Sequence, residues 1–170
     1  MKFSIDKSKS SVAFSVTHMV VSEAEGVFKV FNGSMESSQV DYSDAAIEFS
    51  VDVKSLNTDN QNRDKHLKGP EFFDVAKFPL MKFASTSFVH QNGSNYKLSG
   101  NLTIKAITKP VSFAVTYAGL SSDQKTAVFN AKTTIDRFDY GLQWSKLTEA
   151  GGMIVSREIR VNVTAAFKVK

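Results

Sequence analysis

Ile-Arg-Val-Asn-Val-Thr-Ala-Ala-Phe-Lys-Val, residues 159–169, is the stretch of sequence that decides the fold. Apolar side chains occupy alternate positions in it, and this period of two predicts a β-strand with one buried face. Similar alternation occurs at residues 12–16, 47–53, 98–104, 111–117 and 129–135, with shorter candidates at 27–31 and 81–85. Residues 91–95 and 119–123 have the composition of hairpin loops. About eight or nine strands with regular turns predict an all-β domain, either a sandwich or an antiparallel barrel.

The composition narrows the function classes. The chain has 170 residues, 42% of them apolar, which is the size of a single domain spanning residues 1–170. It has no cysteine, and this excludes disulfides, thiol nucleophiles and cysteine-ligated metal sites. The net charge of +4 comes mainly from dispersed lysines, with only four arginines. Because nucleic-acid binding needs a dense basic patch, we expect no nucleic-acid partner.

No apolar run approaches the roughly 18 residues of a membrane-spanning helix. No signal peptide is visible at Met1–Asp6, so the sequence as it stands predicts a cytoplasmic protein, or a periplasmic one if the chain is a processed form. The candidate strands show about 5–7 alternating residues, fewer than the roughly 9–11 of a membrane-spanning strand. We therefore expect apolar side chains inside a barrel that is either filled or holds one small apolar ligand.

One segment departs from the strand pattern. Thr58 to Gln61 has the spacing of a capping box, and residues 62–68 show no alternation before Gly69-Pro70. This predicts a short polar helix at about 59–68, acting either as a lid near the barrel mouth or as a plain surface connection.

Residues capable of chemistry are few. The three histidines are far apart in the sequence, and no zinc motif, nucleophile motif or phosphate-binding loop is present, so we expect no cofactor and no metal. Half of the four arginines lie in two Arg–Asp combinations, Arg63-Asp64 and Arg137-Phe138-Asp139. An arginine of this kind either braces a loop by pairing with a carboxylate or receives an anionic head group.

Several blocks, in this order, carry a family resemblance: residues 55–58, 63–68, 72–74, 100–105, 108–111 and 137–142. Together they resemble the YceI-like family of lipocalin-like, polyisoprenoid-binding proteins, and the resemblance covers nearly the whole chain. It implies an eight-stranded antiparallel lipocalin-like β-barrel whose elongated apolar interior holds a long-chain lipid. Polyisoprenoids, isoprenoid quinones and fatty-acid derivatives are the implied classes, and the implied role is sequestration or transport without chemistry. Homodimers are also implied, although a closed barrel does not need them.

The resemblance leads to two sets of site residues. For the head group of the lipid we expect Arg63, Asp64, His66, Arg137, Asp139 and His18. For the tail we expect Phe14, Phe49, Phe83, Phe113, Phe129 and Tyr140. Two other functions stay open: a packed barrel that serves as a stress-related interaction protein, and a lipid-modifying enzyme that uses His18 or His66 as its base.

Overall fold

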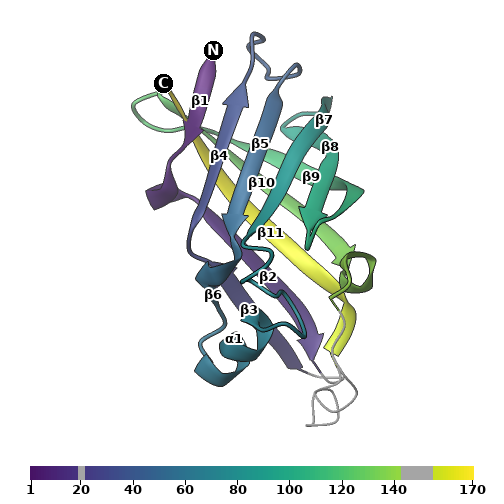
Figure 1. The fold of residues 1–170 in the computed structure, drawn as a ribbon. Coiled ribbons are helices and arrows are strands. Elements are labelled where there is room, and N and C mark those ends of the chain that lie inside the picture. The colour runs from purple at the N-terminus through teal and green to yellow at the C-terminus, as the bar shows by residue number, and fades with distance from the viewer. Residues whose placement is uncertain (19–21, 143–154) are drawn as a thin grey trace.

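A computed structural model describes the chain except for residues 19–21 and 143–154 (Figure 1). Its longer elements are β1 (Lys2–Ile5), β2 (Ser11–His18), β3 (Ser22–Phe28), β4 (Phe31–Glu36), β5 (Ala46–Asp52), β6 (Leu56–Asn57), α1 (Gln61–Lys68), β7 (Leu80–Asn92), β8 (Asn95–Ile104), β9 (Ile107–Leu120), β10 (Thr126–Asp136) and β11 (Val155–Val169). Three short 3-10 helices are η1 (Lys7–Lys9), η2 (Val53–Ser55) and η3 (Arg137–Tyr140).

The strands form a closed antiparallel barrel. β1 and β2 pair with successive parts of the same edge of β11, so together they make one kinked wall strand interrupted by η1. β3 pairs with β2, and β4 pairs with β1. On their other edges, β6 pairs with β3 and β5 pairs with β4. With β7 to β11 this gives eight wall strands, closed by the pairing of β1 with β11. The predicted eight-stranded lipocalin-like barrel is therefore confirmed.

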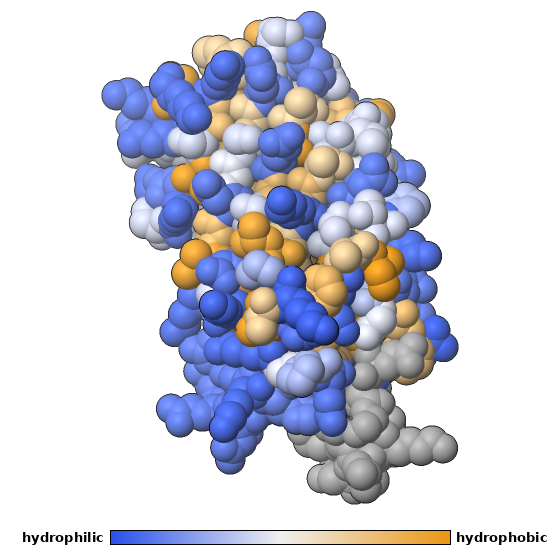
Figure 2. Space-filling model, viewed as in Figure 1, coloured by the Kyte–Doolittle hydropathy of each residue, from blue (hydrophilic) through white to orange (hydrophobic). Residues whose placement is uncertain are grey.

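The apolar side chains of the alternating pattern point into the barrel, as expected. Phe83, Leu98 and Phe113 are buried, whereas the outward positions beside them carry residues such as Lys82 and Lys97. This arrangement buries most of the phenylalanines in one core. The surface is largely hydrophilic, with scattered exposed hydrophobic residues such as Leu80, Val89 and Leu120 on the long strands (Figure 2).

Two details of the strands differ from the sequence predictions. The candidate at 27–31 is a break, because β3 ends at Phe28 and β4 begins at Phe31. The expectation of short strands was also wrong, since β7 to β11 have 10–15 residues. β7 and β9 extend past the core with exposed residues on both faces. A β-bulge between Ser85 and Ser87 in β7 also shifts the phase of the alternation. The two predicted hairpin loops are present, between β7 and β8 and between β9 and β10.

Helix α1 is present near one end of the barrel, but its N-cap is not the predicted residue. The side chain of Asn60 accepts a hydrogen bond from the backbone N–H of Arg63 and caps the helix. Thr58, which begins the predicted capping box, instead donates its hydroxyl hydrogen to the Asp64 carboxylate. Leu67 is the buried residue of the helix, so α1 rests on the barrel through a small apolar contact.

The opposite end of the barrel is filled by aromatic rings. The loop between β4 and β5 folds over this end, where the hydroxyl of Tyr96 donates to the backbone oxygen of Asp41 at 2.7 Å. The ring centre of Tyr42, which lies in the loop, is 5.4 Å from the ring centre of Phe129. The ring centre of Phe88 is 6.0 Å from that of Phe129. The interior is therefore packed at the loop end.

Candidate functional site

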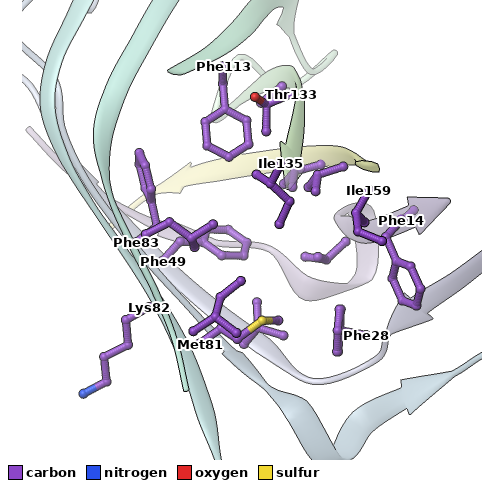
Figure 3. A pocket seen from close by; sticks show the side chains of 18 of the residues that line it. Phe14, Phe28, Phe49, Met81, Lys82, Phe83, Phe113, Thr133, Ile135 and Ile159 are labelled. Atoms are coloured by element: carbon purple, nitrogen blue, oxygen red, sulfur yellow. The ribbon is translucent and has the colours of Figure 1, made fainter. Parts of the chain in front are cut away.

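A cavity of about 200 Å³ lies inside the barrel toward α1 (Figure 3). Its accessible wall is apolar. Ten phenylalanines line this wall. Eight come from strands all around the ring, Phe14, Phe28, Phe49, Phe83, Phe88, Phe113, Phe129 and Phe167, and two, Phe72 and Phe73, come from the segment after α1. Lys82 also touches the cavity, but its ammonium group points away from it (Figure 3). Such a space excludes charged groups and favours hydrocarbon.

Five of the six residues predicted for a lipid tail line this cavity: Phe14, Phe49, Phe83, Phe113 and Phe129. Tyr140 does not line it. It is buried in η3, where burial raises the pKa of its hydroxyl to about 12. The sequence pattern missed Phe72 and Phe73, because they precede β7 in a turn and follow no alternation.

The residues predicted on α1 separate in the structure. Arg63 lines the cavity, and its guanidinium donates to the hydroxyl and the backbone oxygen of Thr58 at 2.9 and 2.8 Å. Asp64 is not part of the lining, since its carboxylate accepts hydrogen bonds from the backbone N–H and the hydroxyl of Thr58. His66 lies outside the lining as well, with its Nε2 at 3.6 Å from a carboxylate oxygen of Glu71. Thr58 thus joins Arg63 and Asp64 into one small network at the start of α1.

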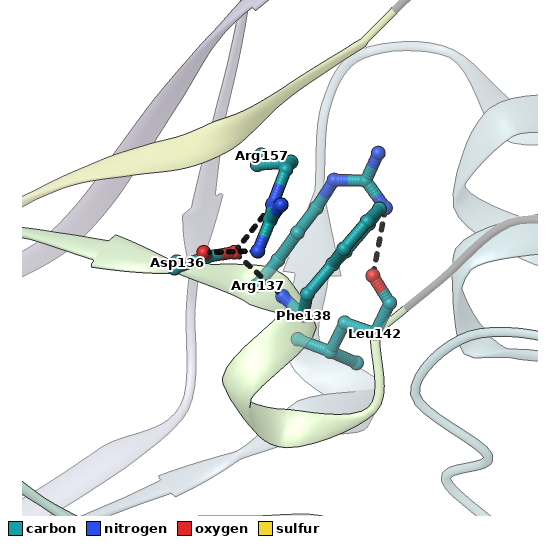
Figure 4. Close-up of polar contacts among 5 residues, drawn as sticks. All are labelled: Asp136, Arg137, Phe138, Leu142 and Arg157. Atoms are coloured by element: carbon teal, nitrogen blue, oxygen red, sulfur yellow. Dashed lines mark hydrogen bonds and ion pairs between the residues drawn. The ribbon is translucent and has the colours of Figure 1, made fainter.

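The second arginine, Arg137, is almost completely buried beside the cavity (Figure 4). One of its Nη atoms donates to the backbone oxygen of Leu142 at 2.7 Å, and its guanidinium carbon lies 4.8 Å from the centre of the Phe138 ring. Because the accessible wall is apolar, Arg137 and Arg63 contribute carbon atoms to it while their guanidinium groups are engaged by the protein.

A surface ion pair braces η3 from outside. Arg157 donates to the Asp136 carboxylate at 2.7 Å (Figure 4). Its guanidinium carbon lies over the Phe138 ring, 4.4 Å from the ring centre. Asp136 also accepts a hydrogen bond from the backbone N–H of Phe138. The hydrogen bond from Arg157, and after it the one from Phe138, lower the pKa of the Asp136 carboxyl. Asp139, one of the predicted head-group residues, is exposed and does not line the cavity.

Two further expectations concern histidine and metals. His18 ends β2, but its side chain lies outside the described part of the structure. Among the described residues, no three His, Asp or Glu side chains are grouped so that they could hold a metal ion. Within the same ranges, no helix is long and apolar enough to span a membrane.

A closed antiparallel barrel with a partly hollow apolar interior places this chain among the lipocalin-like barrels. Residues 3–167 match the model of the YceI-like domain. The UPF0312 protein of Staphylococcus aureus strain MSSA476 is 31% identical over 172 residues, covering 98% of this chain and 97% of that protein. This chain therefore belongs to the YceI-like family.

Solved structures share the fold. BcnA of Burkholderia cenocepacia superposes with a TM-score of 0.85 at 22% identity, covering 95% of this chain and 98% of that one. The YCEI protein of Campylobacter jejuni gives 0.75 at 25% identity, covering 91% and 90%. A polyisoprenoid binding domain from Saccharophagus degradans, implicated in plant cell wall breakdown, gives 0.79 at 14% identity, covering 99% and 98%.

Proposed function

We propose that this protein binds a long-chain lipid, with the hydrocarbon tail in the barrel cavity, and sequesters or transports it without chemistry. The observation that carries the proposal is the apolar cavity of about 200 Å³. An apolar protein cavity of about 150 Å³ stays dry and takes up benzene, so this space is large enough for part of a tail. The polyisoprenoid binding domain of Saccharophagus degradans, which shares the fold, supports the choice of an isoprenoid or acyl lipid.

The size of the cavity bears on how a long tail is held. Burying about eight tail carbons contributes roughly 6 kcal/mol, which is comparable to the cost of association alone. A longer stretch of tail must therefore be covered, and the cavity has to lengthen toward α1. The wall there consists of Leu67, Phe72 and Phe73. Phe73 donates its backbone N–H to the backbone oxygen of Leu67, which ties the segment after α1 to the helix.

For the polar end of the lipid we assign Arg63 and Arg137, the two arginines that touch the cavity. Their guanidinium groups lie beside the apolar wall, and each would exchange a bond to Thr58 or Leu142 for one to the ligand. An arginine holds a phosphate, carboxylate or carbonyl oxygen by charge-assisted hydrogen bonds. Asp64 acts indirectly in this proposal, because its bonds to Thr58 fix the partner of Arg63.

The packed-barrel alternative receives support only from the end near the β4–β5 loop, where Tyr42, Phe88 and Phe129 fill the interior. A barrel that acts only as a packed scaffold has no use for free apolar space beside α1. The cavity therefore favours lipid binding over this alternative.

The test is native mass spectrometry of the purified protein, followed by mass spectrometry of an organic extract. We expect a mass excess that vanishes on denaturation, with an isoprenoid or acyl species in the extract. If the protein is isolated without ligand, titration with an isoprenoid quinone and with a fatty acid follows, and no binding of either would refute the proposal.

Variants test the head-group assignment. We expect Arg63→Ala and Arg137→Met to weaken lipid binding. Methionine is used at position 137 because Arg137 is buried and methionine keeps most of its hydrocarbon stem. Arg160→Ala is the matched control, since Arg160 lies outside the cavity lining and its guanidinium donates to the Ser15 hydroxyl on the outer face. Unchanged lipid affinity in both cavity variants would remove the head-group role.

A further inference from the structure

Three phenylalanines of the cavity wall each face a glycine on the neighbouring strand. Phe14 on β2 is directly opposite Gly26 on β3, and Phe49 on β5 is directly opposite Gly33 on β4. Phe83 on β7 lies beside Gly100 on β8. All three phenylalanines line the cavity, and Figure 3 shows their rings around it.

The rings occupy the space that a side chain at the glycine would need. A Cβ atom placed on Gly26 would lie 2.4 Å from Cζ of Phe14. One on Gly33 would lie 2.7 Å from Cδ2 of Phe49, and one on Gly100 would lie 2.6 Å from Cζ of Phe83. Carbon atoms normally pack at about 3.5–4.0 Å, so each ring lies against bare backbone.

Backbone conformation does not explain these glycines. Among the glycines that the structure describes, those with positive φ are Gly93, Gly119 and Gly141, all of them outside the three pairs. The glycines of the pairs have strand conformations that any residue adopts. Their common feature is the neighbouring ring, although at Gly100 the backbone oxygen of Ala84 lies closer still. Each position therefore requires a residue without a side chain because space is limited.

We propose that the three phenylalanine–glycine pairs determine specificity by setting the width of the cavity for a methyl-branched chain. This inference rests on the proposed lipid binding. With glycine behind it, each ring is drawn back toward the wall. With alanine, the ring must move inward by roughly 1 Å to regain normal contact. A straight acyl chain tolerates the narrower cavity, whereas the methyl branches of an isoprenoid chain do not.

Gly33→Ala is the cleanest test. The new methyl group meets the Phe49 ring, and the nearest backbone atom, the oxygen of Glu48, is at an ordinary distance of 3.4 Å. At Gly100 the new group would instead press on the backbone oxygen of Ala84 at 2.4 Å and disturb the sheet. Ser34→Thr is the matched control, because it adds a methyl group to an exposed position on the same strand.

The probes are hexadecanol and phytanol, which have the same saturated main chain and hydroxyl group and differ by the methyl branches of phytanol. Both are offered in competition and bound species are measured by native mass spectrometry. We expect the wild type to prefer phytanol. We expect Gly33→Ala to lower the phytanol-to-hexadecanol ratio by about tenfold or more, the usual effect of one carbon in a tight apolar pocket. Adding Phe49→Leu to Gly33→Ala should restore the ratio, and Ser34→Thr should not change it.

The outcomes separate this inference from the proposed function. A wild type that binds both alcohols without preference, or a Gly33→Ala variant with an unchanged ratio, overturns the inference and leaves lipid binding intact. A wild type that binds neither alcohol overturns both. If melting curves show that Gly33→Ala does not fold, the same comparison is made with Gly26→Ala, restored by Phe14→Leu.

Discussion

Filling the cavity should stabilise the protein and abolish lipid binding at the same time. Ala131 on β10 lines the cavity and lies between Val115 and Val163 on the neighbouring strands. Ala131→Leu adds three carbon atoms, half the number in benzene, to a space of about 200 Å³. Their burial contributes about 2.4 kcal/mol. Ordering the leucine side chain costs about 0.5–1 kcal/mol, which leaves a gain of roughly 1.5 kcal/mol. For a chain of this length, the melting temperature rises by about 3–6 °C.

The assay has two readouts, thermal unfolding of the ligand-free protein and lipid affinity measured by native mass spectrometry. The matched control is Ala114→Leu, because Ala114 is exposed on β9 directly opposite Lys132 and faces away from the cavity. This control should change neither readout. A lower melting temperature in Ala131→Leu would show that the space is too small or wrongly placed. A raised melting temperature with unchanged lipid affinity would refute the cavity as the binding site.

Three further predictions follow from contacts away from the cavity centre. Phe129→Ala removes the ring that joins the aromatic cluster to the cavity wall. Urea unfolding should show that the free energy of unfolding falls by about 3–5 kcal/mol, and a fall below about 1 kcal/mol would contradict the packing described. Asn60→Ala removes the N-cap of α1 at a cost of about 1 kcal/mol, so hydrogen exchange should quicken in the helix but not in the barrel strands. Asp44 accepts hydrogen bonds from Ser37 and Ser38, which hold the pKa of its carboxyl far below the usual range. Since its unfolded pKa is about 3.9, this stabilisation is complete above that pH and is lost as the pH falls toward the folded value. Asp44→Asn should therefore flatten the acid side of the stability profile, and equal slopes in variant and wild type would exclude this role.

Much of the barrel could be predicted because its inward positions repeat with a period of two. The prediction fails where the backbone changes phase. Phe83 and Phe88 both point inward although they are five residues apart, because the bulge between Ser85 and Ser87 inserts one extra residue. The sequence pattern also gives no sign of the kink between Phe28 and Phe31, because both residues are apolar and buried. Only the partner strand changes there, from β6 beside Phe28 to β5 beside Phe31.

The cavity residues divide in the same way. Five of the aromatic residues chosen by alternation and a resemblance line the space, and so do Phe28, Phe88 and Phe167 at strand positions that were not chosen. Phe73 lies in an irregular segment, and its position depends on a backbone hydrogen bond to Leu67 that no local pattern encodes. The role of Asp64 could not be read from its neighbour Arg63 either, because both side chains bond to Thr58 and not to each other. Tertiary contacts of this kind decide whether a charged residue recognises a ligand or braces a loop.

The position of β11 also has a consequence for synthesis of the chain. Val155–Val169 pairs with β10 along one edge and with β2 and β1 along the other, so these fifteen residues join the two halves of the ring. Until they emerge from the ribosome, β10 and β2 both keep an open edge that another chain could pair with. Closure of this barrel therefore waits for β11, which follows all the other strands in the sequence. A nascent chain arrested before β11 should be more prone to edge-to-edge aggregation than the finished protein.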